Sequence, residues 1–305
     1  MYDIVIIGGG PAGLAAAIYA QRAMLKAVTL EKDAYSTGQI AVSSRVDNYP
    51  GFYGISGDEL GEKMRSHAEE LGAEFLEDEV KNIAPLKDKK GYLLTLEYGG
   101  ELETKTVIFA GGTYHRSLGI KGEREFSGRG ISSCAVCDGA FFKGKPAAVI
   151  GGGDTAFSDA LYLANICSEV YIISRRDVFR AGKSLVAQAE RSDKIKIITN
   201  AVPVEIHGDR LVDSIEISQN GKLSSIAVNG VFIAIGSVPN TDIIAPLVKL
   251  DESGYIIAGE DGVTSADGIF AAGDCRTKKL RQVITAVADG ANCVMSAEKY
   301  IRENR

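Results

Sequence analysis

The cysteines Cys134 and Cys137 have a spacing that can do chemistry, and they lie in the stretch SSCAVCDGAFF. A C-x-x-C pair can be a dithiol–disulfide redox couple, half of a zinc site or two inert buried thiols. A zinc site needs two further ligands, but the other cysteines are scattered and the three histidines are isolated. We therefore predict no metal site. The choice between a redox couple and inert thiols depends on what the rest of the chain builds around them.

The first residues of the chain predict a dinucleotide-binding unit. An apolar run over residues 4–7 is typical of a central parallel strand, and G-x-G-x-x-G follows it. The glycines allow a tight turn and a close approach to a pyrophosphate, and the next helix offers its N-terminal amides to the phosphates. A second strand ends at Glu31, whose carboxylate can accept hydrogen bonds from a ribose diol, as in the ADP half of FAD. The candidate ligands are Gly8, Gly10, Pro11, Ala12, Gly13, Glu31 and Lys32.

A second copy of this pattern begins near residue 146, in PAAVIGGGDTAFSDALYLANICSEVYIISRRDVFRAGKS. Ser174 stands where the first copy has its acid, and two arginines follow it directly. Guanidinium groups there suit the 2′-phosphate of NADPH, although a solvated basic strand end is the plainer alternative. The candidate ligands are Gly151, Gly153, Asp154, Thr155, Arg175, Arg176 and Arg180.

These two patterns decide the fold and the interpretation of the cysteine pair. A short apolar strand near the C-terminus ends at Gly273 and Asp274. Because α/β sheets bind ligands at such strand ends, we expect this segment to contribute to the binding site of the first cofactor. We predict an α/β fold of two Rossmann-like domains, with the second inserted into the first. Residues 1–112 and 246–305 would bind FAD, and residues 113–245 would bind NADPH and carry the C-x-x-C pair. A dithiol beside two dinucleotides favours the redox couple.

Composition and charge exclude several other classes of protein. The chain of 305 residues is 45% apolar and has a net charge of −6, which argues against general nucleic-acid binding. No apolar run is long enough for a membrane span, and the N-terminus has no signal-peptide pattern. The odd number of cysteines, five, and the wide spacing outside the C-x-x-C pair suit a reducing compartment. We therefore expect a cytoplasmic protein.

The motifs together resemble those of the low-molecular-weight thioredoxin reductases of bacteria and archaea, essentially from end to end. The segments that carry the resemblance are GGGPAG at 8–13, GQ at 38–39, DNYPGF at 47–52, CAVCDG at 134–139, GGGDTA at 151–156, RRDVFRA at 175–181, AIGSVPN at 234–240, FAAGDC at 270–275 and RQVITA at 281–286.

The resemblance implies a role for each part of the redox centre. Cys137 would receive electrons from the flavin, Cys134 would attack the disulfide of a bound thioredoxin, and Asp138 would move protons. It also implies non-covalently bound FAD, NADPH as donor, a homodimer and a rotation of one domain against the other. The further flavin ligands implied are Gly38, Gln39, Asn48, Val80, Gly273, Asp274, Arg281, Gln282 and Val283.

The chain departs from the family pattern mainly around the second cofactor. Thr37 replaces a glycine before Gln39, Phe157 and Ser158 alter the helix after the second glycine turn, and Ser174 replaces a common histidine. These departures leave alternatives open: ferredoxin as electron donor, or a glutaredoxin-like or peroxidase-linked acceptor. A third alternative is a flavoprotein NADPH dehydrogenase in which the cysteines take no part.

Overall fold

The computed structural model describes residues 1–33, 35–43, 45–88 and 90–304. The chain divides into two compact units: unit 1 comprises Met1–Tyr114 and Val238–Arg305, and unit 2 comprises His115–Ser237. The second compact unit therefore ends at residue 237, whereas the domain that we predict from the sequence ends at residue 245. The reason is tertiary, because Ile244 is fully buried in the core of unit 1.

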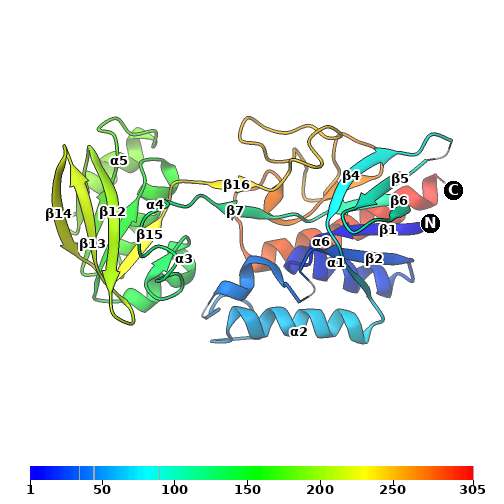
Figure 1. Cartoon of the computed structure of the whole chain (residues 1–305), viewed down its shortest axis with the longest axis horizontal. Coiled ribbons are helices and arrows are strands. Elements are labelled where there is room, and N and C mark those ends of the chain that lie inside the picture. Colours follow the sequence, from blue (N-terminus) through cyan, green and yellow to red (C-terminus); the bar gives the residue numbers. More distant parts are fainter. Residues whose placement is uncertain (34, 44, 89, 305) are drawn as a thin grey trace. The chain divides into compact units, whose positions relative to one another are not determined.

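The central strands of the unit 1 sheet are buried on both faces, whereas its outer strands are partly exposed. The sheet contains β1 (Tyr2–Ile7), β2 (Ala27–Glu31), β3 (Glu74–Glu77), β4 (Val80–Pro85), β5 (Tyr92–Leu96), β6 (Glu101–Phe109) and β17 (Ile269–Ala271). The order is β3-β2-β1-β6-β5-β4, with β17 also paired to β6 (Figure 1). Ile4 and Ile6 enter one core cluster and Val5 enters the other, so successive side chains of β1 fill both faces.

Helices cover one face of this sheet. They are α1 (Pro11–Arg22), α2 (Gly57–Glu70) and α6 (Val283–Glu303), with the short turns η1 (Gly38–Val42) and η3 (Gly273–Cys275). Helix α6 lies very close to α1, because a Cβ on Gly290 would meet the Ala12 oxygen at 2.1 Å. Glycine at this position therefore brings the C-terminal helix to the start of α1, where the first glycine turn ends.

Unit 2 repeats this plan with a fully parallel sheet. The strands are β8 (Ile131–Ser132), β9 (Pro146–Ile150), β10 (Glu169–Ile173), β11 (Ile195–Ile198) and β15 (Gly230–Ile233). Their order, β11-β10-β9-β15-β8, places β9 in the centre, as β1 is in unit 1. The predicted α/β fold with two Rossmann-like units is confirmed.

The two faces of the unit 2 sheet are covered by different elements. Helices pack on one face, and an antiparallel sheet packs on the other (Figure 1). The helical elements are α3 (Ala135–Asp138), η2 (Gly139–Phe142), α4 (Asp154–Ala164) and α5 (Lys183–Glu190). The antiparallel sheet contains β12 (Ala201–Gly208), β13 (Val212–Gln219) and β14 (Lys222–Ala227). The two crossover segments pair with each other as β7 (Thr113–His115) and β16 (Ser237–Pro239).

Within the described residues, none of the helices has both the length and the apolar character needed to cross a bilayer.

Candidate active site

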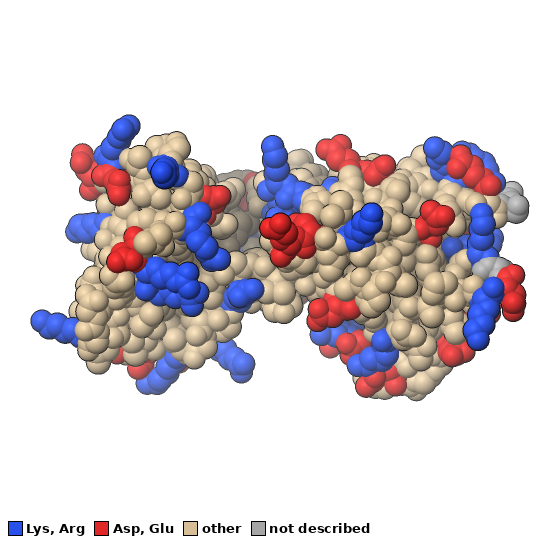
Figure 2. Space-filling view, turned by 90° about the horizontal axis from the view of Figure 1, so that it is seen from above, with Lys and Arg blue, Asp and Glu red and all other residues tan. Residues whose placement is uncertain are grey.

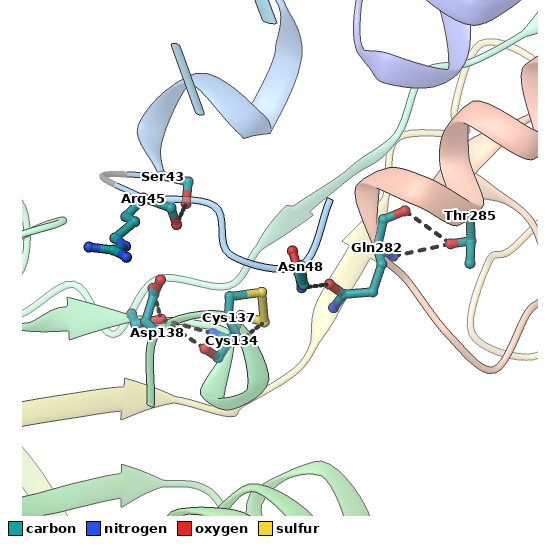
Figure 3. Close-up of a disulfide and its surroundings, with 9 residues drawn as sticks. Ser43, Arg45, Asn48, Cys134, Cys137, Asp138, Gln282 and Thr285 are labelled. Atoms are coloured by element: carbon teal, nitrogen blue, oxygen red, sulfur yellow. Dashed lines mark hydrogen bonds between the residues drawn. A yellow bond between two sulfur atoms is a disulfide. The ribbon is translucent and has the colours of Figure 1, made fainter. Parts of the chain in front are cut away.

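The predicted cysteine pair is joined as a disulfide in unit 2. The Cα atoms of Cys134 and Cys137 are 5.3 Å apart, and the short helix α3 begins directly after the first cysteine. The backbone N–H of Cys137 donates to the sulfur of Cys134 over 3.2 Å (Figure 3). Both cysteines are half-buried, and Val136 between them is 53% exposed. The bond therefore lies in a turn that presents part of its surface to solvent.

Asp138 is tied to this turn through a residue that the sequence did not single out. Its Oδ2 accepts a hydrogen bond of 2.6 Å from the hydroxyl of Ser132, and that hydroxyl oxygen accepts one of 3.0 Å from the Cys134 N–H. Burial raises the pKa of the Asp138 carboxyl, and the bond from Ser132 partly offsets the rise. Ser132 ends β8, at the carboxyl edge of a parallel sheet, where such folds place functional groups.

The first glycine turn has the shape that the sequence predicts. Gly8 has a φ of +110°, and a Cβ on Gly13 would lie 1.8 Å from the Gly8 oxygen, so only glycine lets α1 approach β1 this closely. The nearest neighbour of a Cβ on Gly10 would be the Gly38 Cα at 3.8 Å. Glu31 ends β2 and accepts a 2.7 Å hydrogen bond from the Gly9 N–H. The structure thus brings Gly38 and Glu31 to the same turn.

The C-terminal turn η3 meets the start of α1 from the other side. A Cβ on Gly273 would lie 3.0 Å from the Ala12 Cβ. The next residue, Asp274, has a buried oxygen, Oδ1, with no hydrogen-bond partner among the described residues, and burial raises the pKa of its carboxyl. A buried carboxylate oxygen without a partner is costly, so the site lacks a hydroxyl or N–H donor there. A sugar-alcohol hydroxyl of FAD has the chemistry that this oxygen requires.

The other predicted flavin ligands of unit 1 flank these turns. The Asn48 amide donates to the Gln282 side-chain oxygen over 2.7 Å, and Gln282 forms a capping box with Thr285 at the start of α6 (Figure 3). The guanidinium of Arg281 donates to the Asp274 carbonyl over 3.3 Å and lies 4.2 Å from the centre of the Tyr255 ring. Arg281 therefore contacts the turn of Asp274, and Gln282 and Val283 after it begin α6.

Three of the residues predicted to bind a cofactor have side chains that are buried, bonded elsewhere or exposed to solvent. The side chain of Val80 is buried in the core of unit 1, so only its main chain remains for a ligand. The Gln39 amide donates to the Thr113 carbonyl, which ties η1 to β7. Lys32 is exposed just beyond the end of β2.

The second glycine turn, in unit 2, leaves open space where a phosphate would approach. A Cβ on Gly153 would meet no atom within 4 Å, and α4 begins at Asp154 directly after it, with Thr155 in its first turn. A Cβ on Gly152, by contrast, would lie 2.9 Å from the hydroxyl of Ser174. The buried Ser174 therefore takes the place of the acid and packs against the glycine turn.

The segment of residues 175–182, which we call the arginine loop, is held against the second glycine turn by two hydrogen bonds. The Arg180 N–H donates to the Gly152 carbonyl over 2.9 Å, and Asp154 accepts 2.7 Å from the Gly182 N–H. Arg175 and Arg176 are exposed, so their guanidinium groups remain available to an anion. Lys and Arg side chains predominate on the face of unit 2 shown at the left of Figure 2. The loop thus offers positive charge beside an open phosphate cradle.

The departure at Phe157 has a structural explanation. Phe157 is fully buried, and its ring packs edge-on against Phe179 with centroids 4.9 Å apart. It therefore fills the core beneath α4 and fixes the arginine loop from below. Asp159 on the same helix is half-buried, and this burial raises its pKa to about 6.

Among the residues that the structure describes, one group has a metal-binding set of side chains. Glu205 and His207 on β12 and Glu216 on β13 present oxygen and nitrogen atoms within 4.8 Å of one another. The ammonium of Lys121 lies 2.6 Å from a Glu205 oxygen. Because the Lys121 ammonium already pairs with Glu205, we assign no metal ion to this group.

Known proteins share the whole of this architecture. The sequence profile of the pyridine nucleotide-disulphide oxidoreductases matches residues 2–290. The thioredoxin reductase of Bacillus subtilis (strain 168) is 41% identical over 310 residues, which cover 99% of this chain and 96% of that protein. The bifunctional thioredoxin reductase/thioredoxin of Mycobacterium leprae (strain TN) is 40% identical, over 100% of this chain and 67% of that one. The crystal structure of thioredoxin reductase from Streptococcus pyogenes MGAS5005 has a TM-score of 0.94 at 40% identity and covers 99% of each chain.

The chain belongs to the pyridine nucleotide-disulphide oxidoreductase family. Within it, the full-length identity of about 40% confirms the predicted resemblance to the low-molecular-weight thioredoxin reductases.

Proposed function

We propose that this protein is a flavoprotein that passes electrons from NADPH, through FAD and the Cys134–Cys137 pair, to the disulfide of thioredoxin. The observation that carries the proposal is the C-x-x-C disulfide beside Asp138, in a chain that also contains two dinucleotide turns. The relatives at about 40% identity, which are named thioredoxin reductases, support thioredoxin as the acceptor. In the Mycobacterium leprae relative, the name joins both activities in one protein.

FAD fits unit 1 on the chemistry of the residues there. Gly10 and Gly13 would accommodate the pyrophosphate at the start of α1, Glu31 would accept hydrogen bonds from the ribose, and Asp274 would accept one from the ribityl chain. When bound, a flavin accepts a hydride from a nicotinamide and passes two electrons on to a disulfide. All the proposed flavin ligands belong to unit 1, whereas the dithiol and the proposed NADPH ligands belong to unit 2.

The protein's own residues would complete the reaction by disulfide exchange. In the reduced state, the Cys134 thiolate attacks one sulfur of the thioredoxin disulfide and forms a mixed disulfide, which frees the other thioredoxin sulfur. The Cys137 thiolate then attacks Cys134, re-forms the internal disulfide and releases thioredoxin as a dithiol. Asp138 supplies protons to the leaving sulfurs, for which a carboxyl of raised pKa is suited. We propose Cys134 as the attacking thiol from the family resemblance.

Steady-state kinetics test this proposal against its alternatives. Protein loaded with FAD should oxidise NADPH rapidly only when oxidised thioredoxin is present. Dependence on glutaredoxin in place of thioredoxin would change the acceptor, and reduction by ferredoxin alone would change the donor. Equal NADPH oxidation with artificial acceptors in wild type and in a Cys134→Ser, Cys137→Ser variant, with no thioredoxin reduction in wild type, would favour the dehydrogenase alternative.

The choice of NADPH over NADH rests on the arginine loop. In the Arg175→Ala, Arg176→Ala variant, we expect the KM for NADPH to rise about 10- to 100-fold, because a charge-assisted hydrogen bond contributes about 1.5–3 kcal/mol. The KM for NADH should change less than about twofold, because NADH has no 2′-phosphate to bind the arginines. An Arg210→Ala variant, which removes an exposed arginine from the turn between β12 and β13, is the matched control and should leave both constants unchanged. Equal changes for the two cofactors would remove the 2′-phosphate argument.

The homodimeric state and the cytoplasmic location that we expect from the sequence stay predictions.

A further inference from the structure

We propose that Asp289 and Lys278 are positioning residues of the flavin site: Asp289 fixes the Gly273–Asp274 turn, and the surplus positive charge of Lys278 stabilises the Asp274 carboxylate as a hydrogen-bond acceptor. The proposal rests on the proposed function, because it takes Asp274 to bind FAD.

The first argument is the number of bonds that converge on one carboxylate of α6. Oδ2 of Asp289 accepts hydrogen bonds from the Gly273 N–H at 2.9 Å, from Arg276 Nε at 2.9 Å and from Lys278 Nζ at 2.8 Å. Its Oδ1 accepts a further bond from the Arg276 guanidinium at 2.6 Å. The Gly273 bond reaches the residue directly before Asp274. Asp289 therefore holds the turn through its backbone as well as through its charges.

The second argument is burial. The side chains of Asp289, Arg276 and Lys278 are only 4%, 6% and 6% exposed. Charged groups are rarely removed from water to this extent, because the desolvation cost can exceed the gain from pairing. A buried ion cluster is therefore weak evidence for stability, and its placement beneath η3 calls for another role. The Gly273–Asp274 turn is also constrained sterically. Gly273 adopts a φ of +81°, and a Cβ there would lie 3.0 Å from the Cβ of Ala12 on α1.

The third argument is the balance of charge. Arg276 and Asp289 neutralise each other through two hydrogen bonds, so Lys278 leaves one positive charge in excess. The charged groups that act on Asp274 are Lys278, Arg281 and Arg276, which lower its pKa, and Asp289, which raises it. The three cations come from the segment after η3, Asp289 comes from α6, and the facing start of α1 (Pro11, Ala12, Gly13) is uncharged. The surplus charge of Lys278 therefore acts together with Arg281 to favour an ionised Asp274 against its burial.

The test is FAD binding to flavin-stripped protein, followed by the quenching of flavin fluorescence between about pH 8 and about pH 5. Lys278→Met leaves the neutral Asp289–Arg276 pair intact, so the chain should fold. We expect roughly tenfold weaker FAD binding than in wild type. The loss should deepen as the pH falls, because a higher pKa protonates Asp274 earlier and removes the ionised acceptor. Lys278→Arg should restore the affinity, and Lys279→Met, which removes the adjacent exposed lysine, should leave it unchanged.

Two outcomes separate this inference from the function on which it rests. Wild-type protein that binds no FAD at all would overturn the proposed function. Wild type that binds FAD, together with a folded Lys278→Met variant of the same affinity and pH dependence, would overturn this inference alone. Asp289→Asn provides a second measurement, in which FAD should dissociate more readily; unchanged affinity there would contradict the role given to Asp289.

Discussion

Replacing Cys134 by serine is expected to abolish thioredoxin reduction while NADPH still reduces the bound flavin. A serine hydroxyl is far less acidic than a thiol and cannot form the mixed disulfide, so no route to the thioredoxin sulfurs remains. We expect turnover with thioredoxin to fall by at least about 10³-fold, since the nucleophile itself is lost. The measurement combines steady-state turnover with anaerobic reduction of the flavin by NADPH in the same preparation.

The matched control for this substitution lies in the same unit. Cys167 is a free, buried cysteine in the core beneath α4, and Cys167→Ala should retain thioredoxin reduction. If the Cys134→Ser variant turned over thioredoxin at a substantial rate, the dithiol mechanism would be wrong. If it also lost flavin reduction by NADPH, the substitution would have disturbed more than the exchange step.

The Asp138→Asn variant is expected to lose about 10²- to 10⁴-fold in turnover with thioredoxin, the usual contribution of a positioned general acid or base. Asparagine has the same shape and can still accept a hydrogen bond from Ser132, so the turn around the disulfide should persist. What it lacks is a proton that it can exchange. Rates measured by single turnover with pre-reduced enzyme isolate this step, and an unchanged rate would show that Asp138 moves no proton there.

The pH dependence gives a second and subtler test of Asp138. Burial raises its pKa above the ordinary value, and the hydroxyl of Ser132 opposes the rise. A protonated Asp138 is present below its pKa, so the proton-donating step should slow as the pH rises through that value. Ser132→Ala removes the opposing hydrogen bond, raises the pKa further and should move this limb of the pH–rate profile to higher pH. A shift to lower pH would contradict the assignment.

The sequence was sufficient for those features that depend on residues close together in the chain. The glycine turns, the strand that ends at Glu31 and the loop from Ser174 to Arg180 each lie within a single strand–helix–strand pattern. Their spacing therefore predicts their geometry, because each glycine is required by a short-range contact such as that between Gly13 and the Gly8 carbonyl.

The features that the sequence did not reveal depend on tertiary contacts. Asp289 joins Gly273 only because α6 folds back over α1, and no local pattern distinguishes it from other helix acids. Ser132 is significant only because the turn after β8 brings Asp138 back to it. The end of the second compact unit differs from the predicted domain boundary for the same reason, since the burial of Ile244 is decided by the core of unit 1.

Anaerobic rapid mixing of the FAD-loaded protein with NADPH, followed by addition of oxidised thioredoxin, tests the central claim most directly. Flavin absorbance reports each transfer of electrons in turn. The account predicts rapid bleaching by NADPH and recovery of the oxidised flavin when thioredoxin is added, with both events absent when NADPH is omitted. Bleaching that only reduced ferredoxin can produce, or a reduced flavin that thioredoxin cannot reoxidise, would contradict it.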